Sequence, residues 1–213
     1  MNSRQKILNR LNAQKREAAA PLPWQSHRDF EELAVQFTLA LQKANGEVRR
    51  VESLEAAVLE ISAVLEEIEA QTAVFNDQSP LNALNLPGRW PQIAWRMAGE
   101  PAGEPEDDFR AFCAAADIGL TGVDAALAET GTAVVSSGPG RSRLTPLLPP
   151  VHLALIATSQ LTTDLFTWTA ACSEAPPAAM TLISGPSKTA DIEQTMAIGV
   201  HGPKRFIVIL YND

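Results

Sequence analysis

The second half of the chain alternates short apolar runs with glycine, proline or amphipathic stretches. From residue 118 onward, continuous apolar runs such as LALIA are typical of strands buried on both faces of a largely parallel sheet. Parallel strands require crossover connections, and Thr158–Cys172 and Ser187–Ile198 are long enough to form crossover helices. We therefore expect five strand-rich segments, DIGLTGVDAALAE, TAVVSS, VHLALIAT, AMTLIS and RFIVILY.

The first half continues the same alternation of helix and strand. Apolar residues at helical spacing predict a helix over about residues 29–44, which Asn45-Gly46 can end. A short strand, EVRRV, follows, and Ser53 can cap a helix whose apolar stripe runs from Leu54 to Ile68. The pattern predicts a three-layer α/β fold with one core over residues 26–213.

Two segments lie outside this regular pattern. Residues 1–25 interleave charges with Ile7, Leu8 and Leu11 before Pro21 and Pro23, which indicates an N-terminal helical arm. Residues 76–108 are rich in proline and glycine and end in acidic residues, so most of them are expected to form a long surface excursion. Trp90 and Trp95 are expected to pin that excursion to the body.

Composition narrows the classes of partner. The formal net charge of −8 disfavours nucleic acid and anionic lipid surfaces as partners. No apolar run resembles a secretory signal or a membrane span, so we expect a cytoplasmic location. The two cysteines, Cys113 and Cys172, are far apart in sequence and are expected to be buried thiols.

Four segments in the second half carry more than fold information. They are AETGT at residues 128–132, Arg143 with LLPPVH at 147–152, GPSKTADIE at 185–193 and GVHGP at 199–203. Their order and spacing resemble the LutC/YkgG family, the lactate utilization protein C or LUD-domain proteins. The resemblance is strongest over residues 118–213.

That resemblance implies a fold of the NagB/RpiA/CoA-transferase-like superfamily. It also implies an accessory subunit of an iron–sulfur-dependent system that oxidises L-lactate to pyruvate, working beside partner subunits. An iron–sulfur cluster usually needs several cysteine thiolates, so the cluster is expected only in a partner and no cofactor in this chain. The alternative is a stand-alone enzyme of the CoA-transferase or sugar-phosphate-isomerase type.

The Gly185–Glu193 segment is the first candidate binding loop. It follows a strand-like run and precedes a helical pattern, so Ser187 or Thr189 can cap a helix and free amides there would attract an anion. Lys188 would add positive charge. Asp191 and Glu193 would instead repel an anion, so a capped helix without a ligand remains the alternative.

The other candidates are single side chains. Glu129 resembles in placement the loop glutamate of CoA transferases and could act as nucleophile or base, with Thr130 and Gly131 beside it; a buried post for the turn is the alternative. His152 and His201 are candidates for ligand binding or proton transfer, but they can lie at opposite strand ends, so they are not an obvious metal pair.

Arg143 is a candidate clamp for a small carboxylate or phosphate, its alternative being a solvated loop charge. We expect no metal site and no nucleotide cofactor, since neither a P-loop nor a Rossmann glycine pattern occurs. Because ligand crevices in α/β sheets form outside the carboxyl ends of strands, we expect the candidate loops to converge there.

Overall fold

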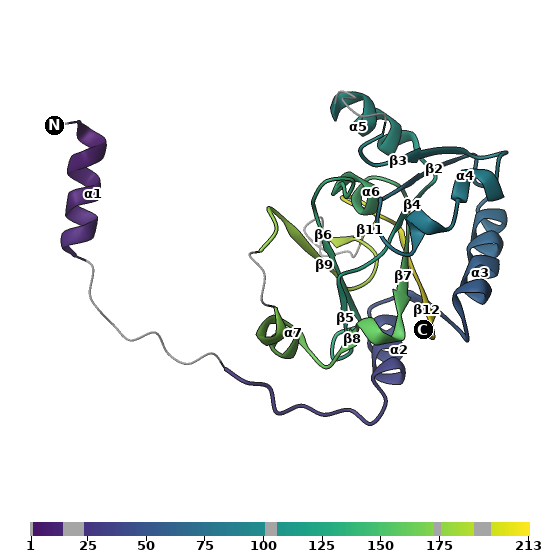
Figure 1. Ribbon diagram of the computed structural model, residues 1–213, viewed down its shortest axis with the longest axis horizontal. Helices are drawn as coiled ribbons and strands as arrows, with labels where there is room; N and C mark the ends of the chain where they lie inside the picture. The colour runs from purple at the N-terminus through teal and green to yellow at the C-terminus, as the bar shows by residue number, and fades with distance from the viewer. Residues whose placement is uncertain (1, 15–23, 101–105, 173–175, 190–196) are drawn as a thin grey trace.

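The computed structural model describes residues 2–14, 24–100, 106–172, 176–189 and 197–213. Its body is an α/β domain, and helix α1 (Ser3–Ala13) stands apart from it at the N-terminus (Figure 1). This helix lies within residues 1–25, the segment for which the sequence predicts an N-terminal helical arm. No helix among these residues is long and apolar enough to cross a membrane.

A six-stranded sheet forms the centre of the body. Its strand order is β1-β12-β7-β4-β2-β3, and every neighbouring pair is parallel. The two longest strands, β7 and β12, lie in the middle and come from the apolar runs VHLALIA and RFIVILY. The strands are β1 (Glu47–Val51), β2 (Thr72–Phe75), β3 (Ala94–Met97), β4 (Ile118–Thr121), β7 (Val151–Ala157) and β12 (Arg205–Tyr211).

Helices cover both faces of this sheet. Helix α3 (Leu54–Glu67) begins as predicted at Ser53, whose hydroxyl accepts the N–H of Ala56 at 3.2 Å. It packs with α4 (Leu86–Arg89) on one face, where odd-numbered residues of β7 and β12 point. The other face carries α2 (Leu33–Lys43), α5 (Glu106–Ala115) and α6 (Leu144–Leu147). These three layers confirm the predicted fold class.

A second sheet of four strands, not foreseen from the sequence, packs on the α2 side of the core. Its order is β8-β5-β6-β9, with antiparallel and parallel pairs. Two of the runs assigned to the parallel sheet, TAVVSS and AMTLIS, form strands of this mixed sheet instead. Its members are β5 (Ala125–Leu127), β6 (Thr132–Ser136), β8 (Leu161–Thr162) and β9 (Met180–Ile183).

The stretch 76–108 differs from the expected surface excursion. It contains the short helix η1 (Leu81–Ala83), helix α4 and edge strand β3 of the main sheet. Leu81 and Leu86 are fully buried or nearly so, and Trp90 is 9% exposed in the same core. Proline and glycine obscured the local pattern, but apolar burial decided the outcome. The expected packing of Trp90 and Trp95 is confirmed.

Both expected crossover helices differ from the prediction. Thr158–Cys172 divides into η2 (Thr158–Gln160), strand β8 and helix α7 (Leu165–Ala171). After Ser187 the chain forms strand β10 (Lys188–Thr189), which pairs antiparallel with β11 (Ala197–Ile198). The prediction of a helix that starts at Ser187 is therefore wrong, because Lys188 and Thr189 form a strand. Residues 190–196, which include Asp191 and Glu193, lie outside the described residues.

Candidate functional site

A loop formed by residues 137–143 covers the carboxyl ends of β2 and β3. Asn76, which follows β2 and is fully buried, donates from Nδ2 to the Ser142 carbonyl at 3.4 Å and accepts the Ser142 N–H at 3.1 Å. The N–H of Asp77 donates to the Gly140 carbonyl at 2.8 Å. These three hydrogen bonds hold the loop against the sheet.

The connections that follow β2 and β4 leave on opposite faces of the sheet. The connection after β2 enters the core beneath α3, where Leu81 and Leu86 pack, whereas Val123 after the neighbouring strand β4 joins the core beneath α2. Connections that leave adjacent parallel strands on opposite faces open a crevice outside their carboxyl ends. The fold therefore places its topological switch point between β2 and β4.

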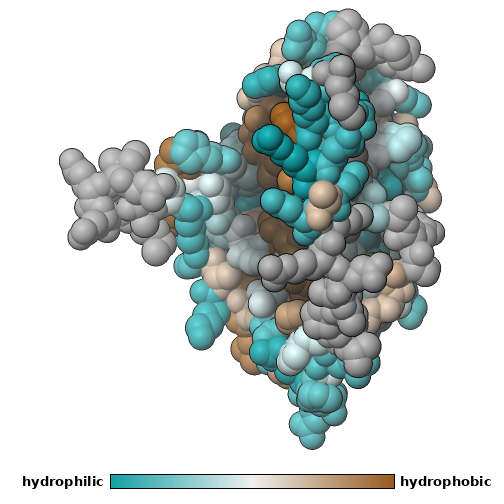
Figure 2. Space-filling view, turned by 90° about the vertical axis from the view of Figure 1, so that its left-hand side faces the viewer, coloured by the Kyte–Doolittle hydropathy of each residue, from teal (hydrophilic) through white to brown (hydrophobic). Residues whose placement is uncertain are grey.

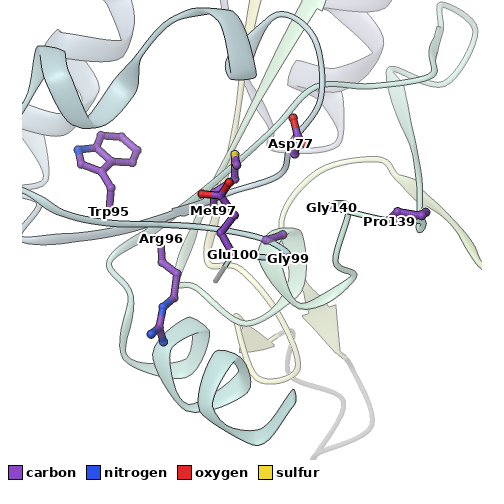
Figure 3. Close-up of a pocket in the computed structure, with 9 residues that line it drawn as sticks. Asp77, Trp95, Arg96, Met97, Gly99, Glu100, Pro139 and Gly140 are labelled. Carbon is purple, nitrogen blue, oxygen red and sulfur yellow. The ribbon is translucent and has the colours of Figure 1, made fainter. Parts of the chain in front are cut away.

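A cavity of about 770 Å³ opens beside this point; we refer to it as the carboxyl-end cavity (Figure 3). Gly99 and Gly140 form part of its wall, with φ of +84° and +68°, a region that favours glycine. A Cβ on Gly140 would lie 2.8 Å from the Cβ of Asp77, so a side chain there would force the loop away. The lining residues are Asp77, Trp95, Arg96, Met97, Ala98, Gly99, Glu100, Pro139 and Gly140.

The charged side chains of this cavity are mainly acidic. Figure 3 shows Asp77 and Arg96 pointing in opposite directions, and the Arg96 guanidinium lies 5.0 Å from the ring centre of Phe112. Asp77 accepts a hydrogen bond from Asn82 Nδ2 at 3.0 Å, and Glu100 also lines a smaller cavity of about 270 Å³ on the other side of β3. The interior therefore suits a ligand with hydroxyl or amino donors.

The sequence prediction did not include the residues of this cavity, because they fall in the stretch assigned to a surface excursion. One signal could have found them. Asn76, Asp77 and Gln78 directly follow the buried strand TAVF, and polar residues after a strand of a parallel sheet face the ligand-binding edge.

Three of the predicted loops meet at the opposite end of the sheet. Gly131 and Gly185 approach the last turn of α2, which leads through Asn45-Gly46 into the first residue of β1. Ser187 and Pro203 are joined by a hydrogen bond of 2.9 Å just before β12 begins. These loops converge as expected, but at the amino ends of the strands and not at the carboxyl ends.

Close packing against α2 explains why residues 131 and 185 are glycines. Gly131 has φ +62°, and a Cβ on it would lie 2.2 Å from the backbone N of Leu41. Gly185 has φ +106°, and its Cβ would lie 2.6 Å from the Ala44 carbonyl oxygen. Each position needs glycine so that its loop can touch the backbone of α2. Between the two loops, Thr132 Oγ1 shares hydrogen bonds of 2.6 Å with Thr130 Oγ1 and with Ser184 Oγ.

Lys188 completes the contact with α2. Its ammonium donates to the Ala44 carbonyl at 2.7 Å and to Asn45 Oδ1 at 2.6 Å, at the negative end of the helix dipole. This cation stabilises a helix end and already has two acceptors. Thr189 lies beside it in β10, and His201 is exposed in the turn before β12.

Lys188→Ala is expected to lower the free energy of unfolding by about 1 kcal/mol, because the last carbonyls of α2 lose a charge-assisted hydrogen bond. Urea denaturation measures the change. Lys204→Ala, which alters another exposed lysine before β12, should change stability by less than about 0.5 kcal/mol. Equal stability of Lys188→Ala and the wild type would contradict the capping role.

Glu129 lies in an ion-pair cluster with the segment that precedes α2. Arg28 Nε is 3.0 Å from Glu129 Oε1, and Arg28 Nη1 is 3.8 Å from Oδ2 of Asp164, whose side chain is fully buried. Ser26 donates to the same Asp164, and Trp24 packs edge-on against Phe166 of α7 at 4.5 Å. Glu129 is therefore held by an ion pair with Arg28, and its side chain stays partly exposed.

Hydrogen bonds keep Asp164 ionised in this cluster. Burial alone would raise the pKa of its carboxyl, but hydrogen bonds from Ser26 and Thr167 and the charge of Arg28 together hold that pKa below its usual value. Its Oδ1 accepts the Thr167 N–H at 2.8 Å and so caps α7. The cluster therefore fixes residues 24–28 to the body.

His152 is a core residue of β7. It is fully buried, stacks on Phe206 at 5.0 Å between ring centres, and its Nε2 lies 2.8 Å from Thr121 Oγ1. Burial lowers the pKa of its imidazole to about 3, so the ring is neutral near pH 7. Its Nδ1 has no hydrogen-bond partner among the described residues. His152 and His201 both lie toward the amino ends of adjacent strands.

Arg143 is the one predicted ligand residue that belongs to the loop of residues 137–143. It directly follows Ser142, which Asn76 anchors, and its side chain is exposed at the start of α6. Of the cysteines, Cys113 is buried as expected, but Cys172 is exposed because it follows the end of α7. Among the described residues, no group of three or more His, Cys, Asp or Glu could hold a metal ion.

Comparison with known proteins places this chain among named relatives. Lactate utilization protein C 1 of Bacillus mycoides is 30% identical over 195 residues, which cover 86% of this chain and 80% of that protein. Lactate utilization protein C of a Geobacillus species is 27% identical, with 98% and 94% covered. The counterpart in Halalkalibacterium halodurans is 43% identical over a shorter match of 104 residues, 46% of this chain and 45% of that protein.

The fold has a counterpart of known structure. The crystal structure of a DUF162 family protein from Deinococcus radiodurans superposes with a TM-score of 0.59 at 21% identity, covering 84% of this chain and 96% of that one. The family model of the LUD domain matches residues 34–211, from the start of α2 to the end of β12. The chain therefore belongs to the LUD domain family, together with proteins named lactate utilization protein C.

Proposed function

We propose that this chain is an accessory, non-redox subunit of a system that oxidises L-lactate to pyruvate. The observation that carries the proposal is the match to lactate utilization protein C 1, which extends over 80% of that relative rather than over one motif. A second relative with the same function in its name matches over 94% of its length. The LUD family model spans residues 34–211, which include both the six-stranded and the four-stranded sheet.

The thiols of this chain do not fit an iron–sulfur cluster. Such clusters are usually held by four cysteine ligands, and the sequence contains two cysteines. Cys113 is buried within α5, whereas Cys172 is exposed beyond α7 on a different part of the body. In the proposed system the electron-transferring cluster therefore belongs to a partner subunit.

We further propose that a small anionic ligand binds at the carboxyl ends of the strands. Arg143 supplies the positive charge from the anchored loop, and a guanidinium can bind a carboxylate in two parallel hydrogen bonds. Asp77 and Glu100 would repel the anionic group from the cavity interior and accept hydrogen bonds from hydroxyl groups of the ligand. A hydroxy acid has both kinds of group.

Co-purification with native partner subunits, followed by lactate-dependent dye reduction, tests this function. The complex is expected to reduce the dye and the isolated chain is not, because it lacks a cluster. Dye reduction that is unchanged when this chain is left out would contradict the proposal. Turnover of an acyl-CoA or a sugar phosphate by the chain alone would favour the enzyme alternative instead.

The ligand site has its own test in the same complex. Arg143→Gln should weaken lactate-dependent activity by about ten- to a hundredfold at low lactate, since it removes a charge-assisted contact. Arg50→Gln is the matched control, because Arg50 is an exposed arginine in β1, away from the loop. If both variants behave like the wild type, the anion does not bind at Arg143, while the subunit role still stands.

A further inference from the structure

Helix α1 has an apolar face that the described part of the chain does not cover. Within the part of the chain that the structure describes, α1 buries none of its residues, and Figure 1 shows it well away from the body. Ile7, Leu8 and Leu11 share one face and are 59%, 37% and 60% exposed. Isolated helices of this length are marginal in water, so a packing partner would stabilise α1.

The arm and the body carry opposite charge. Residues 1–17 contain five basic residues and one acidic residue, a net charge of +4. The remaining 12 basic and 24 acidic residues give the rest of the chain a net charge of −12, for the total of −8. Figure 2 shows hydrophilic residues lying beside exposed hydrophobic patches on the face that it presents. A basic amphipathic helix is attracted to an acidic surface that offers apolar contacts.

The outer face of α2 offers such a surface. Val35 and Leu39 lie one helical turn apart and are 36% and 59% exposed. Glu31 and Glu32, both exposed, lie beside them at the start of the helix. A groove of about 350 Å³ runs along this end, lined by Phe30, Glu31, Glu32, Val35 and Gln36.

We propose that α1 docks on this groove of a second copy of the chain, so that two copies exchange their arms. Ile7 and Leu11 would pack against Val35 and Leu39, and Arg4 would approach the two glutamates. The arm is tethered where Trp24 packs on Phe166, and residues 14–23 span at most roughly 35 Å when extended, which is long enough for α1 to extend to the groove of a second copy. The exchange is symmetric, as expected for a homodimer.

Sedimentation of the full chain over a range of concentrations tests the apolar contact. The wild type is expected to form a dimer, and Ile7→Ser with Leu11→Ser should weaken the dimer by about a hundredfold, since both arms lose two aliphatic contacts. Gln5→Ser with Asn9→Ser makes the same number of changes on the opposite face of α1 and should leave the dimer intact. Equal weakening by the two pairs would overturn the docking.

A charge exchange tests whether docking occurs between copies. A chain with Glu31→Lys and Glu32→Lys and a chain with Arg4→Glu and Arg10→Glu should each be monomeric, because arm and groove then repel each other. An equimolar mixture should form a heterodimer, since each arm now meets a groove of opposite charge. A mixture that stays monomeric would overturn the proposal.

Other occupants of the apolar face would give different results. Docking within one copy would give a monomeric wild type, and a variant with Leu8→Cys, Leu39→Cys and Cys172→Ser would then form a disulfide between residues 8 and 39 of the same chain; Cys172→Ser removes the exposed native thiol. A monomeric wild type that binds vesicles of anionic phospholipid through Ile7 and Leu11 would show a membrane-binding helix. Either result overturns the arm exchange.

Discussion

Gly131→Ala is expected to destabilise the protein more than any other single substitution considered, by about 3–5 kcal/mol. The backbone at this residue has φ +62°, which costs a residue with a Cβ about 1–2 kcal/mol. The added methyl would also lie 2.2 Å from the N and 2.6 Å from the Cα of Leu41. Backbone atoms of α2 cannot rotate away as a side chain can, so the loop or the helix must move.

Urea denaturation of Gly131→Ala should therefore show a lower midpoint with little change in slope. Gly138→Ala is the matched control, because its Cβ would meet only the guanidinium end of Arg141, at 3.0 Å, and its φ is not in the left-handed region. That control is expected to lose less than about 1 kcal/mol. A Gly131→Ala protein as stable as the control would show that the contact with α2 relaxes easily.

His152 is expected to make the protein less stable as the pH falls from 6.5 to 4.5. Its pKa is about 3 in the folded protein because the ring is fully buried, whereas an unfolded histidine has a pKa of about 6.5. Above pH 6.5 both states are neutral, so the residue contributes no pH dependence. Below that value only the unfolded state takes up the proton, which lowers the free energy of unfolding by about 1.4 kcal/mol per pH unit.

Between pH 6.5 and 4.5, the free energy of unfolding of His152→Gln should fall by about 2–3 kcal/mol less than that of the wild type, because glutamine does not titrate. Denaturation curves at several pH values measure the difference. Thr121→Val is the control: it removes the partner of Nε2 and should cost about 1 kcal/mol at every pH while the slope is retained. If His152→Gln shows the same pH dependence as the wild type, the ring binds its proton equally well in the folded and the unfolded protein, and burial does not lower its pKa.

The sequence indicated loops that meet in the structure, but not where on the sheet they meet. Lys188 and Gly131 were singled out, and the structure brings their loops together, but against the end of α2. Asn76 and Asp77 at the carboxyl-end cavity were missed because glycine and proline nearby indicated an irregular surface segment. Local composition describes backbone preference, whereas a cavity depends on which distant loops meet.

The sequence by itself determined only some of the local elements of this protein. Apolar runs predicted that β7 and β12 are buried strands of a largely parallel sheet, and Ser53 marked the start of α3, because burial and capping act over a few residues. Only the tertiary structure decided that β10 and β11 pair, that a second sheet forms, and that Asn76 holds Ser142 across 66 residues of sequence. Strand partners and loop contacts are non-local, so their free energy depends on residues that no local pattern contains.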